Sequence, residues 1–88
     1  MSQRSLSTIA NEINELWAKK LPSRYFGAIP YLRAMRELDT LRDSYGADSA
    51  RSIVAYFLSN AVGWRGEDAR RIKKELNDML RSDRHETK

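Results

Sequence analysis

The chain has 88 residues and a mass of 10.2 kDa, which suffices for one small domain but not for a second hydrophobic core. Hydrophobic residues make up 41% of the chain and charged residues 32%, as in folded domains rather than disordered segments. No apolar run approaches the roughly 20 residues of a membrane-spanning helix, and no apolar export signal is found at the N-terminus. The chain has no cysteine, which excludes disulfides, thiolate catalysis and cysteine-based metal sites.

The charge balance is moderately basic. Sixteen Lys and Arg residues against twelve Asp and Glu residues give a formal net charge of +4. Such a balance is compatible with nucleic acid or an acidic partner, but the positive charges are spread along the chain and form no basic arm.

Hydrophobic residues recur every three or four positions along the whole chain, which predicts a compact all-α domain of four helices. The first helix is expected over residues 6–21, with Ser5 or Ser7 as its N-cap and Pro22 as its stop. Its inner face would comprise Leu6, Ile9, Ala10, Ile13, Leu16, Trp17 and Leu21. Residues 22–27 are expected to form a loop, since they are bracketed by a proline and a glycine.

The second helix is expected over residues 28–45. Pro30 would lie in its first turn, where the missing N–H has no partner to lose. Gly46 would end the helix as a left-handed C-cap. The inner face would comprise Tyr31, Ala34, Met35, Leu38, Leu41 and Tyr45.

The third helix is expected over residues 49–61, with Asp48 as its N-cap. Residues 52–64 contain no charged side chain, and a helix that is apolar around most of its circumference belongs in the middle of a domain. The third helix is therefore predicted to be the central one. Its polar strip is made of small uncharged side chains and one phenol, namely Ser52, Tyr56, Ser59 and Asn60. A solvated strip normally carries Lys or Glu, so we expect this one to be covered by the first helix or by a second copy of the protein.

The fourth helix is expected over residues 67–81, with Glu67 and Asp68 at its positive end and Arg81 near its negative end. Its inner face would comprise Ala69, Ile72, Leu76, Met79 and Leu80. Pairs spaced i,i+4 are expected to add about 0.2–0.5 kcal/mol each, namely Glu67–Arg71, Arg71–Glu75 and Lys74–Asp78. Residues 82–88 contain no apolar side chain, hold the single His85, and are expected to form a disordered tail.

Aromatic residues beside glycine mark two loops. Tyr25 and Phe26 precede Gly27, and Trp64 and Arg65 precede Gly66. Aromatic and arginine side chains in such loops are enriched at protein interfaces, although in a small bundle they also serve as lids on the core. The residues predicted to bind a protein partner are Tyr25, Phe26, Ser52, Tyr56, Ser59, Trp64 and Arg65.

An alternative function is DNA binding. The third helix, a short glycine-containing turn and the fourth helix resemble a helix-turn-helix in outline. One flank of the fourth helix would carry Arg70, Lys73, Lys74, Asn77 and Arg81, and Arg with Asn is the combination that reads guanine and adenine edges. Against this, Glu67 and Asp68 at the helix start would repel phosphate, and alternating charges are common on solvated helices.

Catalytic chemistry has little basis in this sequence. The acidic pairs each have a basic neighbour and no glycine-shaped loop, and there is no glycine-rich phosphate loop. We therefore expect no catalytic residues, no cofactor and no metal site, and a protein that is not an enzyme.

Four segments carry a resemblance to a known group of proteins. They are Tyr-Phe-Gly-Ala-Ile-Pro-Tyr-Leu (25–32), Tyr-Gly-Ala-Asp-Ser (45–49), Ile-Val-Ala-Tyr-Phe-Leu-Ser-Asn-Ala (53–61) and Trp-Arg-Gly-Glu-Asp-Ala-Arg (64–70). Together they resemble small uncharacterised proteins encoded by phages of actinobacteria, mycobacteriophages in particular. The resemblance implies a cytoplasmic protein of an infected bacterium, and it assigns no binding residues. We therefore expect a non-enzymatic phage accessory protein that engages a host or phage protein, or a second copy of itself as a homodimer, and that does not act at a membrane.

Overall fold

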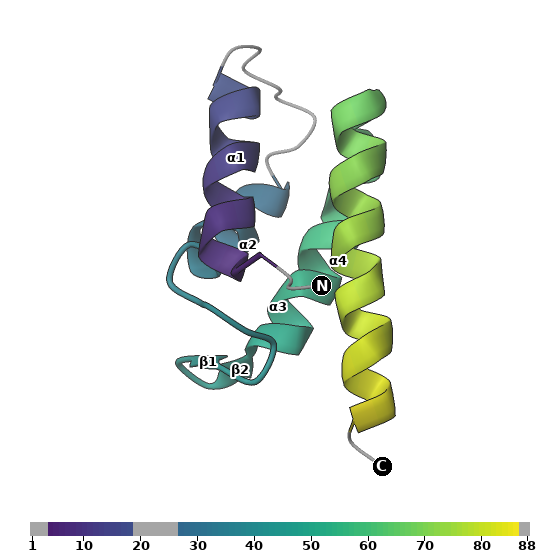
Figure 1. Ribbon diagram of the computed structural model, residues 1–88. Coiled ribbons are helices and arrows are strands. Elements are labelled where there is room, and N and C mark those ends of the chain that lie inside the picture. Colours follow the sequence, from purple (N-terminus) through teal and green to yellow (C-terminus); the bar gives the residue numbers. More distant parts are fainter. Residues whose placement is uncertain (1–3, 19–26, 87–88) are drawn as a thin grey trace.

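The computed structural model describes the backbone of residues 4–18 and 27–86 and the side chains of these ranges as far as residue 82. In these residues the chain forms four helices and one two-stranded hairpin (Figure 1). The helices are α1 (Leu6–Ala18), α2 (Ile29–Met35), α3 (Ala50–Asn60) and α4 (Glu67–Glu86), and the strands are β1 (Ser44–Tyr45) and β2 (Asp48–Ser49). The predicted four-helix domain is confirmed. Within the part that is described, no helix combines the length and the apolarity needed to span a bilayer.

Helix α3 holds the central position that its lack of charge predicts. It contacts both α2 and α4, while α1 and α4, which an ion pair between Glu12 and Arg71 joins, run in opposite directions (Figure 1). Phe57 of α3 is fully buried, and its ring stacks on Trp17 of α1 with 5.7 Å between ring centroids. Buried side chains from all four helices form a single core. Burial of each large apolar side chain contributes about 1.5–3 kcal/mol, so this shared core holds the helices together.

Helix α1 begins as the sequence predicts. The Ser5 hydroxyl accepts a hydrogen bond from the backbone N–H of Thr8 at 3.1 Å, which identifies Ser5 as the capping residue. The first helical residue, Leu6, donates its N–H to the carbonyl of Asp39 at 2.8 Å, which fastens the start of α1 to the segment after α2. The predicted stop at Pro22 lies outside the described residues.

Helix α2 is shorter than predicted, and this corrects the expected range of 28–45. Pro30 lies in its first turn as expected, but the helix ends at Met35 and the chain continues through turns. The Asp43 carboxylate accepts hydrogen bonds from the N–H groups of Asp39 and Thr40, at 2.8 and 3.0 Å. These bonds compete with the helical pattern and also lower the pKa of Asp43, through Thr40 first and then Asp39.

A hairpin occupies the place expected for the end of the second helix. Strands β1 and β2 are antiparallel, with Ser44 opposite Ser49 and Tyr45 opposite Asp48. Gly46 has a φ of 62°, as predicted, but it serves the hairpin turn and not a helix C-cap. Because Asp48 belongs to β2, the N-cap of α3 is Ser49, whose hydroxyl accepts from the N–H of Ser52 at 3.1 Å.

Helix α4 begins at Glu67 as predicted but extends to Glu86, five residues beyond the expected end. The predicted disordered tail is therefore wrong for residues 82–86, while residues 87 and 88 lie outside the described part. Each residue added to an established helix gains one backbone hydrogen bond, and Arg and Glu, both present in residues 82–86, have high helix propensity. Four of the five predicted inner residues of α4 are buried, and Leu80 is partly buried.

Candidate functional site

The outer side of α3 forms an uncharged surface, which we call the α3 face. It comprises Ser52, Ala55, Tyr56, Ser59 and Asn60, with Val62 directly after the helix. The inner side of the same helix is anchored by Ile53, Val54 and Phe57, all buried. This anchoring orients the α3 face outward, where the Tyr56 side chain is 51% exposed and Val62 is 66% exposed.

The expectation that another part of the chain covers this polar strip is wrong. Tyr56, Ser59 and Asn60 are exposed, and Ser52 is partly buried and accepts a hydrogen bond from the Ser49 hydroxyl at 3.0 Å. Small uncharged side chains hydrogen-bond easily to water, so they need no cover. The α3 face is therefore available to a partner outside the chain.

Tyr56 is held in place by its neighbours. Its ring lies against that of Tyr31 from α2, with 5.5 Å between ring centroids. The side-chain amide of Asn60 donates to the carbonyl of Tyr56 at 2.8 Å. Gly27 lies so close that a Cβ there would be 2.8 Å from Oδ1 of Asn60. The ring contact with Tyr31 restricts the Tyr56 side chain and so reduces the entropy that binding would remove.

Trp64 is part of the core and not of an exposed surface. Only 7% of the residue is exposed, and its ring meets that of Trp17 edge to face with 5.4 Å between centroids. The structure therefore corrects the prediction that Trp64 binds a partner and supports its alternative role as a lid on the core. Arg65 beside it is exposed. Tyr25 and Phe26 lie outside the described residues, so their predicted partner contacts stay predictions.

Contrary to the sequence prediction, Lys73 does not belong to an exposed basic flank of α4. Nζ of Lys73 turns inward and donates to the carbonyl of Trp64 at 2.7 Å, 6.0 Å from the Trp64 ring centroid. Burial, and secondarily the charge of Arg65, lower the pKa of Lys73. Arg70, Lys74, Asn77 and Arg81 are exposed as expected.

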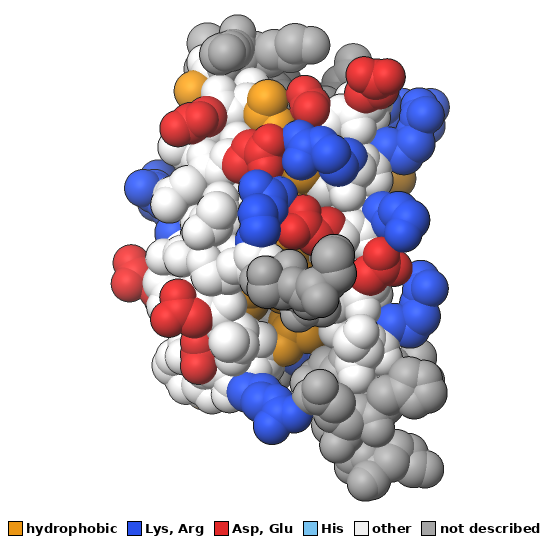
Figure 2. All heavy atoms as spheres, viewed as in Figure 1, with side chains coloured by type: hydrophobic (Ala, Val, Ile, Leu, Met, Phe, Trp, Pro, Cys, Tyr) orange, Lys and Arg blue, Asp and Glu red, His pale blue; other side chains and the backbone are white. Residues whose placement is uncertain are grey.

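A carboxylate also borders this flank. Asp78 lies 2.9 Å from Nζ of Lys74 and 3.9 Å from Nη1 of Arg81. Figure 2 shows the resulting alternation of basic and acidic side chains along the edge of the molecule that α4 forms. The Lys74–Asp78 pair confirms one of the three predicted i,i+4 ion pairs.

Arg71 departs from the predicted pairing with Glu67 and Glu75. Its guanidinium binds Glu12 of α1 at 2.7 Å and Asp68 at 3.1 Å. Arg4 completes a network between the helices, because it binds Glu12 at 2.8 Å and Glu75 at 2.7 Å. Nothing in the local sequence pairs these groups, since they come together only when α1 packs beside α4.

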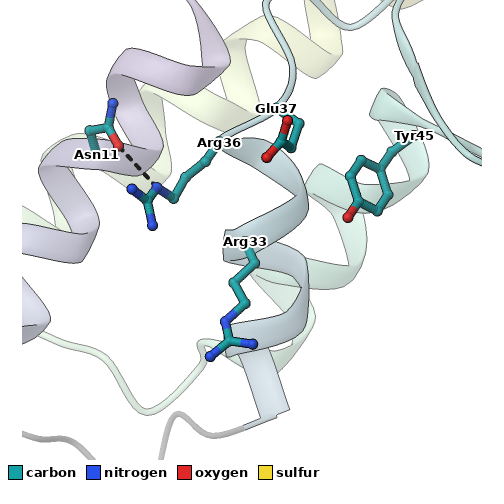
Figure 3. A pocket seen from close by; sticks show the side chains of 5 residues that line it. All are labelled: Asn11, Arg33, Arg36, Glu37 and Tyr45. Carbon is teal, nitrogen blue, oxygen red and sulfur yellow. Dashed lines mark hydrogen bonds between the residues drawn. The ribbon is translucent and has the colours of Figure 1, made fainter.

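A pocket of about 500 Å³ lies on another part of the molecule, between α1, α2 and the hairpin. It is lined by Asn11, Arg33, Arg36, Glu37 and Tyr45 (Figure 3). Sequence reasoning missed this site, because its residues are spread over 35 positions and form no motif; the one local signal is the i,i+3 spacing of Arg33 and Arg36.

Among the described residues, no cluster of three or more His, Cys, Asp or Glu side chains could hold a metal ion. Comparisons with known protein families, with curated proteins and with solved structures return no match for this chain.

Proposed function

We propose that this chain is a non-enzymatic binding module that engages a protein partner through the α3 face. The single observation that carries the proposal is an exposed surface without charge, centred on Tyr56 and Val62, in a chain of which 32% of residues are charged. The centres of protein interfaces are depleted of charged residues and enriched in aromatic ones.

The chemistry of the α3 face favours a protein partner. Tyr56 supplies a large apolar ring and a hydroxyl, and its contact with Tyr31 fixes the ring at low entropic cost. Ser59 and Asn60 supply adaptable hydrogen bonds, whereas a nucleic acid would be expected to select a basic surface.

The resemblance to actinobacterial phage proteins suggests the setting. A phage accessory protein in the host cytoplasm would engage a host protein, and this is the partner that we propose. A phage protein or a second copy of the chain, as a homodimer, are the other partners that the same surface fits, because two uncharged faces do not repel each other.

The proposal is tested by photo-crosslinking in an actinobacterial lysate. A photoreactive phenylalanine derivative replaces Tyr56 in one variant and Asn14, on the exposed side of α1, in the matched control. We expect a discrete crosslinked protein from position 56 and none from position 14, and loss of the same protein from pull-downs with Tyr56→Arg but not Asn14→Arg. Identical results at both positions would refute binding through α3.

The same samples identify a homodimer. Light scattering gives 10.2 kDa for a single chain and twice that mass for a pair. A crosslinked pair from position 56 that Tyr56→Arg abolishes would make the second copy the partner.

DNA binding through α4 is the second candidate, and it rests on the exposed Arg70, Asn77 and Arg81 on one flank of that helix. It has less support, because Lys73 points inward and Asp78 forms ion pairs with Lys74 and Arg81. Binding of this kind weakens steeply as salt rises. A gel shift of duplex DNA at low salt, lost with Arg70→Gln and Arg81→Gln together, would favour it, and no shift at low salt would exclude it.

A further inference from the structure

The pocket between α1, α2 and the hairpin places two arginines around one space. Arg33 of α2 and Arg36, which directly follows that helix, are both exposed, while Tyr45 lines the pocket from β1 (Figure 3). Asn11 lines the pocket from α1. Three separate elements therefore present polar groups to one hollow of about 500 Å³, a volume typical of ligand sites.

Within the described residues, the two arginines lack the carboxylate partners that some of the other basic residues have. Arg4, Arg71 and Lys74 each bind a carboxylate within 3.1 Å. In the described part of the chain, Arg33 and Arg36 form no ion pair with any carboxylate, although Glu37 lines the same pocket.

Arg36 is nevertheless fixed in orientation. Its Nε donates to Oδ1 of Asn11 at 3.1 Å, which leaves both Nη groups to donate elsewhere (Figure 3). A guanidinium oriented in advance loses less entropy when it binds an anion, and its planar fork matches the two oxygens of a carboxylate.

Glu37 adds a carboxylate to the pocket. With one carboxylate against two guanidiniums, the charged side chains of the pocket sum to +1, so the pocket attracts an anion. The Glu37 carboxylate can also accept a hydrogen bond, and a peptide provides backbone N–H groups close to an acidic side chain.

We propose that this pocket binds a single carboxylate from an acidic segment of a protein partner. Arg33 and Arg36 donate to the carboxylate, Asn11 holds Arg36, and Glu37 accepts from a backbone N–H of the bound segment. The site does not depend on the α3 face, because it requires only a peptide carboxylate.

The test is a titration of the ¹⁵N-labelled full chain with acetyl-Gly-Glu-Gly-amide, followed by NMR. A single carboxylate site of this size is expected to bind with a Kd on the order of 1 mM. We expect shifts at the Arg Nε–H groups of Arg33 and Arg36 and at the Tyr45 amide, and no such shifts with the Gln counterpart of the peptide.

Variants locate the site. Arg33→Gln and Arg36→Gln should each weaken binding about tenfold, whereas Arg70→Gln on α4 removes the same charge and should leave binding unchanged. The spectrum of each variant reports whether it folds, and the Glu and Gln peptides give an independent comparison in the unmodified protein. Tyr56→Arg should also leave binding unchanged, which separates this site from the α3 face.

Three outcomes would overturn the proposal: equal binding of the Glu and Gln peptides, equal losses in Arg33→Gln and Arg70→Gln, or tighter binding of inorganic phosphate than of the Glu peptide at these residues. The last result would assign the pocket to phosphate ligands instead.

Discussion

Oε2 of Glu12 on α1 lies 2.7 Å from Nη2 of Arg71 on α4, and these two residues are 59 positions apart in the sequence. Arg4 binds the other oxygen of the same carboxylate at 2.8 Å. Hydrogen bonds from Arg71 and then from Arg4 lower the pKa of Glu12 below its usual value. One carboxylate therefore joins the N-terminal segment, α1 and α4.

Replacement Glu12→Gln should lower the free energy of unfolding by about 1 kcal/mol at pH 7 and low salt, because a partly exposed network of charges contributes this much. Because the folded pKa is below the unfolded value of about 4.3, the stabilisation is present above that pH and is lost as the pH falls through the folded pKa. Urea unfolding at pH 7 and pH 3 should therefore show a difference from the unmodified chain that shrinks in acid.

The control for this substitution is Glu15→Gln, an exposed residue of the same helix. It should leave the stability unchanged at both pH values. An effect of Glu12→Gln that does not depend on pH would contradict an electrostatic role.

The two sides of α3 should respond very differently to truncation. Phe57→Ala removes a fully buried ring that stacks on Trp17, and it should cost about 3–5 kcal/mol of unfolding free energy. Tyr56→Ala, on the exposed side, should cost under about 1 kcal/mol. Thermal unfolding followed by circular dichroism measures both, and similar losses would contradict the assignment of inner and outer sides.

Gly66 permits the turn that leads into α4. Its φ is 114°, a conformation that side chains with a Cβ rarely adopt, so Gly66→Ala should destabilise the fold by about 1–3 kcal/mol. Gly46, with φ of 62°, lies in the left-handed region that Asn tolerates, so Gly46→Asn should cost about 0.5 kcal/mol or less. Urea midpoints compare the two variants, and a larger loss for Gly46→Asn would contradict this reasoning.

Lys73 should stabilise the fold, unlike the exposed basic residues of α4. Lys73→Gln removes the hydrogen bond to the carbonyl of Trp64 and should lower the free energy of unfolding by about 1 kcal/mol. Arg70→Gln, three residues earlier and exposed, should be neutral. Unfolding followed by tryptophan fluorescence compares the two variants. Equal losses of stability would contradict a stabilising role for the inward-pointing Lys73 side chain.

The sequence alone determined the helices whose apolar periodicity and end signals agree. One of the two predicted caps, Ser5, caps α1, Pro30 lies in the first turn of α2, and α4 begins at Glu67. The central position of α3 also followed, because its wide apolar side needs more than one neighbouring helix to cover it. These features depend on neighbours close in the chain, whose chemistry can be read directly.

Only the tertiary structure decided where α2 ends. Leu38 continues the helical spacing and is buried, yet it lies beyond the end of α2. The spacing of apolar residues indicates which side chains face the core, but it does not determine the backbone conformation at each of them. The exposure of Tyr56 was likewise not readable, since uncharged polar groups are stable both in water and in an interface.

The sites that bring distant residues together were also decided by the tertiary structure. Glu12 meets Arg71, and Asn11 meets Arg36, across helices that are far apart in the sequence. Local sequence determines which residues can form a helix and which side it buries. The pairing of charges and the walls of a pocket depend on how those helices pack, and only the folded chain fixes those distances.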